Sequence, residues 1–294
     1  MLYIVQTALQ LGCIYSFAAL ALFLSYRILQ IADLTTDGCF VLGMAVSIVF
    51  TIQGHPVLGV FMGMLLGGVA GLLTALLQTY FGVPSILAGI ITNTGLYTVN
   101  LMVMGWSSNL SILKNKTIFT LFKETGIAGS WNSIILAGCI VIIVMVLMRW
   151  FLSTRLGLSI RATGDNIDMV SSSSINPKTT IIIGLILSNM LTGLSGAMAS
   201  QLQKSADINA GTGIVTVGLA TLIIGETLVN GKKSITRNIV ACLVGNIIYR
   251  CIYAFVLQSH IIPVECLKLM TAVIITLAIA IPYIQDEKRR KTIC

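Results

Sequence analysis

The sequence has few charged residues. Asp, Glu, Lys and Arg make up 10% of its 294 residues, whereas about 25% is usual for a soluble domain. Hydrophobic residues make up 56%. This composition excludes an ordinary soluble enzyme, a disordered chain and a coiled coil. We therefore expect an all-α, polytopic integral membrane protein.

The sequence also lacks the patterns of metal, disulfide and nucleotide sites. Its two histidines form no HExxH or HxH pattern, and its seven cysteines contain no CxxC pair. The segment GETLVNGKKS at 225–234 resembles a phosphate-binding loop, but the spacing of its glycines is one residue too long. We expect no metal site, no cofactor bound by this chain and no catalytic constellation. Any ATP that drives its activity must be bound by another subunit.

The formal net charge is +8, and the basic residues gather in short loops and at the C-terminus. This distribution indicates membrane topology rather than nucleic-acid binding. The polar stretch 153–178, the loop at 232–237 and the tail at 285–294 carry most of the basic side chains. The positive-inside rule makes these regions cytoplasmic and places the other long polar stretch, 105–131, outside.

The apolar runs predict about eight to ten membrane segments. Some runs are shorter than the roughly 20 residues that span a bilayer core. Because backbone groups cannot stay unpaired against lipid, such interrupted helices must be buried or line a cavity. The runs lie at about 3–26, 38–53, 57–80, 84–104, 132–152, 179–203, 212–229, 238–257 and 268–284.

Small residues mark two surfaces for close helix packing. Glycines recur at every fourth position in GVFMGMLLGGVAG, at Gly59, Gly63, Gly67 and Gly71. On a helix they form one smooth stripe, which lets a neighbouring backbone approach closely. The segment SNMLTGLSGAMAS at 188–200 is a second, weaker surface of this kind.

Two similar segments suggest an internal inverted repeat. Asp33 opens DLTTDGCFVLG and Asp207 opens DINAGTGIVTVG, and each leads into a short apolar segment that contains glycine. Asn93 and Tyr97 follow the first segment, and Asn246 follows the second. Broken helices in corresponding places of two halves are typical of transporters with a binding site near the bilayer midplane.

Carboxylates within apolar segments are expensive in lipid, so we expect them to face a cavity or a partner. For Asp33 and Asp37 two interpretations stay open: capping an interrupted helix or lining a pore. If they, together with Asp207, coupled transport to H⁺ or Na⁺, the chain would be a secondary transporter. We expect Glu226 to pair with a lysine of the 232–233 loop.

The stretch 157–178 has the pattern of a docking element. A turn at Gly164-Asp165-Asn166 precedes the short helix-like piece IDMVSSSSI, and Pro177 ends it. A short helix held between two membrane spans on the cytoplasmic side can transmit motion from a soluble partner by rigid-body contact.

Three segments resemble permeases of ATP-binding cassette (ABC) importers. TRLGLSIRATGDNIDMVSSSSIN resembles the coupling-helix region of the branched-chain amino acid and ribose permease superfamily, with Ser171–Ser174 departing from its usual pattern. IADLTTDGCFVLGMAV and ADINAGTGIVTVGLATLIIGE resemble the interrupted early segment of this superfamily and its later counterpart. The resemblance covers about residues 10–285. It is greatest to the branch of tryptophan and tyrosine uptake permeases that work with a substrate-binding lipoprotein.

This resemblance implies a single transmembrane permease domain over 1–294, in a bacterial cell membrane. It implies a homodimer surrounded by lipid, two copies of a cytoplasmic ABC ATPase that bind ATP-Mg, and an external binding protein docked on the outer loop. The solute would be a small molecule such as an amino acid, with an aromatic amino acid implied by the branch.

The same reading assigns two sets of residues. The substrate pathway would be lined by Asp33, Thr35, Thr36, Asp37, Asn93, Tyr97, Asp207, Asn209 and Asn246. Coupling to the ATPase would use Gly157, Arg161, Gly164, Asp165, Asn166, Asp168 and Met169.

Overall fold

A computed structural model describes residues 2–113, 115–124, 131–173, 175–229 and 234–258, together with 272, 273 and 276. The expected run at 268–284 lies outside the described residues apart from those three, as does the whole tail at 285–294. The described chain is almost entirely helical, as expected. Its elements are α1 (Leu2–Leu22), the π-helix η1 (Phe23–Ile28), α2 (Thr35–Ile52), α3 (Pro56–Thr79), α4 (Ser85–Val103), β1 (Asn109–Ser111), α5 (Ile118–Glu124), α6 (Asn132–Ser153), α7 (Arg155–Asp165), α8 (Ile167–Ser172), α9 (Pro177–Gln203), β2 (Ser205–Asp207), α10 (Ile214–Val229) and α11 (Ile235–Gln258).

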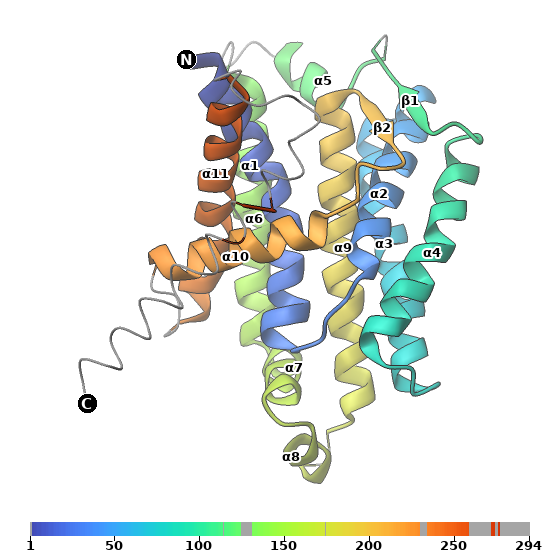
Figure 1. Cartoon of the computed structure of the whole chain (residues 1–294), viewed down its shortest axis with the longest axis vertical. Helices are drawn as coiled ribbons and strands as arrows, with labels where there is room; N and C mark the ends of the chain where they lie inside the picture. The colour runs from blue at the N-terminus through green and yellow to red at the C-terminus, as the bar shows by residue number, and fades with distance from the viewer. Residues whose placement is uncertain are drawn as a thin grey trace.

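Seven helical segments of the described chain are long and apolar enough to cross a membrane. They are α1 continued by η1, and α2, α3, α4, α6, α9 and α11. The apolar helix α10 has only 16 residues, so it is about 24 Å long, which is less than the roughly 30 Å core of a bilayer. It crosses the bundle obliquely in front of α1 (Figure 1). The multi-pass membrane architecture and one of the expected short segments are therefore present.

The two long polar stretches lie at opposite ends of the bundle (Figure 1). One end carries α7 and α8, and we call it the α8 end. The other carries β1, β2 and α5, and we call it the α5 end. The two strands pair antiparallel, with Asn109 opposite Asp207. The arrangement agrees with the alternation of helices that the sequence predicts for 105–131 and 153–178.

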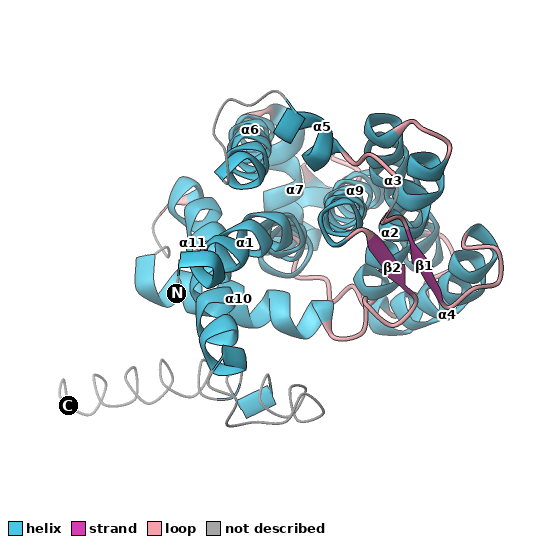
Figure 2. Cartoon of the chain, turned by 90° about the horizontal axis from the view of Figure 1, so that it is seen from above, coloured by secondary structure: helices cyan, strands magenta, loops and turns pink. Residues whose placement is uncertain are grey.

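Helix α9 lies at the centre of the bundle, between α1 on one side and α2 and α3 on the other (Figure 2). The glycine stripe of α3 packs against it. An added Cβ on Gly67 would lie 2.5 Å from the carbonyl oxygen of Asn189 and 3.1 Å from Cα of Gly193. An added Cβ on Gly193 would likewise lie 2.5 Å from the carbonyl oxygen of Gly63. The two small-residue surfaces predicted from the sequence are therefore partners in one interface, where the backbones approach closely.

Filling this interface should destabilise the protein. We expect Gly67→Val to cost about 1–3 kcal/mol, because the new side chain overpacks the α3–α9 contact. The matched control is Gly138→Val on α6, where an added Cβ meets no atom within 4 Å. Thermal unfolding of the detergent-purified variants measures both effects. Equal melting temperatures for the two variants would contradict the packing argument.

Candidate functional site

The chain is not helical between η1 and α2, and Asp33 holds this break together. One carboxylate oxygen accepts the backbone N–H of Thr35 at 2.9 Å, and the other accepts the side-chain amide of Asn189 on α9 at 2.7 Å. The Thr36 hydroxyl donates to the carbonyl of Asp33 at 3.1 Å, and the Thr35 hydroxyl lies 2.8 Å from that of Thr74. Asp33 is only 2% exposed. This carboxylate therefore caps the interrupted helix.

Asp37, in the first turn of α2, caps a different helix. Its two carboxylate oxygens accept the backbone N–H groups of Gly213 and Val215, at 3.1 and 3.0 Å. These amides belong to the start of α10, where the first N–H groups of a helix have no partner within the helix. Asp37 thus joins the start of α2 to the start of α10.

Asp207 makes a third pairing of this type. One of its carboxylate oxygens accepts the backbone N–H of Asn209 at 2.7 Å. Asp33 accepts the N–H of Thr35, which is also two residues further along the chain, in the same way. The other carboxylate oxygen of Asp207 accepts the side-chain amide of Asn109 on β1 at 3.3 Å. The two segments proposed as repeats therefore share a local hydrogen bond, and the symmetry of the whole halves stays a prediction.

The breaks meet at a pocket of about 290 Å³ between α2, α4 and the loop that precedes α10. It brings together four predicted pathway residues: Asp37, Asn93, Tyr97 and Asn209. The remaining lining residues are Gly38, Val41, Thr94, Asn100, Ile208, Gly211 and Thr212. Five predicted residues do not line it, namely Asp33, Thr35, Thr36, Asp207 and Asn246.

Sequence reasoning missed Asn100. It lies seven residues after Asn93 on α4, which places the two on the same helix face, and that spacing was a usable signal. Its side-chain N–H donates to the carbonyl of Gly38 at 3.2 Å. Its side-chain oxygen is buried and has no hydrogen-bond partner in the described part of the chain.

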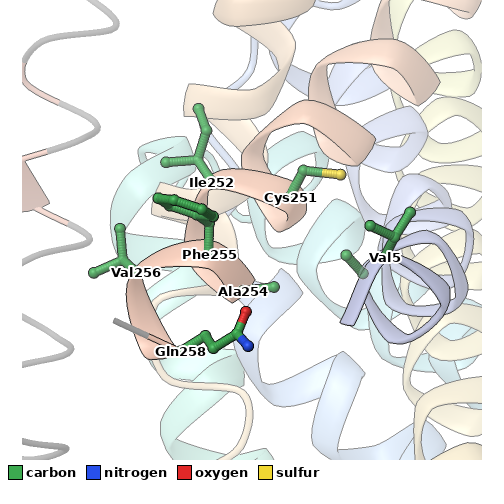
Figure 3. A pocket seen from close by; sticks show the side chains of 8 residues that line it. Val5, Cys251, Ile252, Ala254, Phe255, Val256 and Gln258 are labelled. Carbon is green, nitrogen blue, oxygen red and sulfur yellow. The ribbon is translucent and has the colours of Figure 1, made fainter. Parts of the chain in front are cut away.

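Asn246 lies apart from this pocket. It is buried in α11, and its side-chain oxygen has no partner among the described residues. A pocket of about 400 Å³ lies further along α11, beside α1, and is lined almost wholly by apolar residues such as Val5, Ile252 and Phe255 (Figure 3). Its described lining has one amide side chain, that of Gln258, and no charged side chain, so this part of the pocket offers little to a polar solute.

The predicted docking element contains two helices where the sequence suggested a turn and one short helix. Gly164 and Asp165 close α7, and the turn is the single extended residue Asn166. The Asn166 side chain accepts the backbone N–H of Met169 at 3.0 Å and so caps α8. The apolar side chains of Ile167 and Met169 are each 53% exposed.

The remaining predicted coupling residues divide into an exposed and an inward-facing set. Asp165 and Asp168 are exposed, Arg161 is half-buried, and Gly157 is buried in the first turn of α7. Helix α7 is joined to α9 by the hydroxyls of Thr163 and Thr180, 2.8 Å apart.

The docking element contacts the membrane helices through Gly164. A side chain there would overlap the carbonyl of Ile28, at the end of η1. Arg27 precedes Ile28 in η1, and its Nε lies 3.0 Å from a carboxylate oxygen of Glu226 on α10. The lysine pairing expected for Glu226 involves residues outside the described chain, and Arg27 is the partner that the structure has. Contacts thus run from α7 through η1 to α10.

The geometry separates structural from lining residues, and this can be tested. We expect Asp33→Ala to cost about 1–3 kcal/mol, because the buried N–H of Thr35 and the amide of Asn189 lose their acceptor. Tyr97→Ala should leave the melting temperature nearly unchanged, because this side chain is 51% exposed at the pocket. Thermal unfolding of the purified chain measures both. An Asp33→Ala variant as stable as the parent would overturn the capping role.

Comparison with known proteins gives the family. Residues 4–279 match the family model described as branched-chain amino acid transport system, permease component. The chain is 34% identical to the tyrosine transport system permease protein of Clostridioides difficile (strain R20291), over 89% of this chain and 85% of that one. It is 31% identical to the protein RP368 of Rickettsia prowazekii (strain Madrid E), over 94% and 97% of the two chains.

A more distant relative is the D-allose transport system permease protein AlsC of Escherichia coli (strain K12), 28% identical over 58% of this chain and 51% of that one. No solved structure matches the chain. The chain therefore belongs to the family of branched-chain amino acid transport system permease components, and it is a multi-pass membrane subunit of an ABC transporter rather than an enzyme.

Proposed function

We propose that this chain forms the solute path of an ATP-driven importer, as a single permease domain in a bacterial cell membrane. The observation that carries the proposal is the pocket where the breaks before α2 and α10 meet. It is lined by a carboxylate and several amide and hydroxyl side chains. Polar groups in apolar segments are expensive unless they face a cavity or a partner.

The pocket suits a small polar molecule rather than a lipid. Asn93, Thr94, Asn100, Asn209 and Thr212 supply hydrogen-bonding side chains within about 290 Å³. Tyr97 adds an exposed aromatic ring. An amino acid, aromatic by analogy with the tyrosine permease, fits this combination. Asp33, Thr35, Thr36, Asp207 and Asn246 take the supporting role in this proposal, because none of them lines the pocket.

The partners in this proposal follow from the two ends of the bundle. The ABC ATPase, in two copies, docks on α7 and α8 through the exposed side chains of Asp165, Ile167, Asp168 and Met169. A binding protein docks on the α5 end and delivers the solute. A second copy of the chain completes the path across the exposed polar face of α4, which carries Thr94, Gly95 and Thr98.

The alternative, an ion-coupled secondary transporter, is disfavoured. Asp33, Asp37 and Asp207 each use both carboxylate oxygens to accept N–H groups. A proton bound in every transport cycle would compete with these N–H donors for the same carboxylate oxygens, so it would weaken the bonds that hold the interrupted segments in place.

Docking on α8 can be tested with exposed residues, since a side chain at Gly164 would disturb the packing against η1. We expect Asp165→Arg and Ile167→Asp to lower uptake by at least about tenfold, as loss of a docking hot spot does. ATP hydrolysis should lose its response to solute, while the melting temperature stays unchanged. The control is Ser153→Ala, an exposed residue at the end of α6. Normal uptake in both docking variants would refute the assignment.

The second test asks whether transport depends on a separate ATPase subunit. Reconstituted alone in liposomes with an imposed H⁺ or Na⁺ gradient, the chain should accumulate no solute. Together with its ATPase and binding protein, it should accumulate solute when ATP is supplied. Radiolabelled uptake measures both. Accumulation by the lone chain that an ionophore abolishes would replace this proposal with the secondary transporter.

A further inference from the structure

The pocket is rich in hydrogen-bond acceptors and holds one negative charge. Its described lining contains the carboxylate of Asp37 and no Lys, Arg or His. We propose that it selects solutes by a protonated amino group, accepting cationic and zwitterionic amines and rejecting anions. This inference rests on the proposed function of the pocket and names the chemical class of solute that passes through it.

The first part of the argument is the orientation of Asn100. Its Nδ2 donates to the carbonyl oxygen of Gly38, which can only accept. The amide orientation is therefore fixed, and Oδ1 is an acceptor. That oxygen has no partner in the described chain, although the residue is only 1% exposed. A buried carbonyl without a donor is unfavourable, so a solute that brings an N–H group to it gains affinity.

The second part is the remaining capacity of Asp37. Each of its oxygens accepts one backbone N–H from the start of α10. An ionised carboxylate has about four acceptor positions, so about two remain for a ligand. The two backbone N–H groups carry only partial charges, so they do not neutralise the carboxylate of Asp37. The carboxylate thus keeps its attraction for a cation while it holds α10.

The third part is the arrangement of these groups around Gly38. Asp37 is its neighbour in the chain, Asn100 binds its carbonyl, and an added Cβ would lie 2.5 Å from the side-chain amide of Asn93. Because a side chain at Gly38 would overlap Asn93, the glycine lets α4 pack closely against α2 and holds the amides of Asn93 and Asn100 beside this part of the chain. Asp37 and Asn100 line the same pocket, and an ammonium group has three N–H donors, so one such group has enough donors for both acceptors.

Tyr97 completes the selection at the edge of the pocket. Its ring is half exposed and lines the same cavity. An aromatic face attracts a cation and stacks on an aromatic solute. Both interactions favour an amine with an apolar or aromatic body, and neither compensates an anion for approaching Asp37.

Direct binding to the full chain in nanodiscs tests the inference without the binding protein. The probes are tyramine, tyrosine, 3-(4-hydroxyphenyl)propionate and D-allose, which are a cation, a zwitterion, an anion and a neutral polyol. Ligand-observed NMR titration gives their affinities. We expect the two amines to bind at least about tenfold more tightly than the anion, the size of one hydrogen bond to a charged group. Equal affinities, tighter binding of D-allose, or no binding by any probe would overturn the inference.

Two variants test which groups provide the selection. Asp37→Asn and Asn100→Leu should each lower the ratio of amine to anion affinity by at least about threefold, because each removes one favourable acceptor. A purely structural defect would weaken all probes alike and leave that ratio unchanged, which would count against the inference. The control, Ser153→Ala, changes an exposed residue at the end of α6 outside the pocket lining and should keep the ratio of the parent.

The outcome separates this inference from the proposed function. Uptake by the complete transporter tests the path, through a loss of transport in Tyr97→Ala. If this variant loses uptake while the pocket shows no preference for amines, the path stands and amine selection fails. If uptake is normal in Tyr97→Ala, the proposed path itself fails, whatever the binding data show.

Discussion

The structure depends on pairing backbone groups where helices are interrupted inside a membrane. Lipid offers no hydrogen bonds, so every N–H and C=O left free by a break must find a partner within the protein. The breaks before α2 and α10 meet this demand with aspartates. Asp33 caps the start of α2, Asp37 caps the start of α10, and Asp207 closes the turn between β2 and α10. Removing these carboxylates would leave the N–H groups that they bind without an acceptor.

The same pairing creates the cavity. Because Asp37 joins the start of α2 to the start of α10, the loop at 208–212 is held beside α4. The glycine interface of α3 and α9 is linked to the start of α2 through Asn189. This residue borders Gly67 of α3, and its side-chain amide binds the carboxylate of Asp33. Close packing, helix capping and cavity formation are thus one connected arrangement.

Helix α10 also connects the pocket to the α8 end. Its first turn is held by Asp37, and Glu226 near its last turn is paired with Arg27 of η1. The residue after Arg27 packs against Gly164 of α7. Packed elements move as units because protein interiors are dense and resist compression. Two contacts and one helix therefore connect α7 to the wall of the pocket, which is the route along which the proposed coupling to an ATPase would act.

The sequence predicted what depends on local pattern. The glycine stripe, the alternation of polar stretches and the interrupted segments follow from periodicity and hydropathy, and the structure has them. The partners of the aspartates were not predictable in this way, because Asn189, Gly213 and Val215 are far from Asp33 and Asp37 in the chain. The pairing of Glu226 with Arg27 was missed for the same reason. Helix α7 was not predicted, because its polar sequence gives no apolar run, and its last two residues, Gly164 and Asp165, were assigned to a turn.

Under the proposed function, the division between capping and lining residues limits how such a permease can change its solute. Tyr97, Thr94 and Asn93 line the cavity from α4, and no described backbone break depends on their side chains. They are free to vary with the solute at little cost to the fold. Asp37 is different, because it both borders the cavity and holds α10. In the proposed solute path, a chain that keeps this cap also keeps a carboxylate beside its solute, so the way in which α10 is held restricts which solutes can pass.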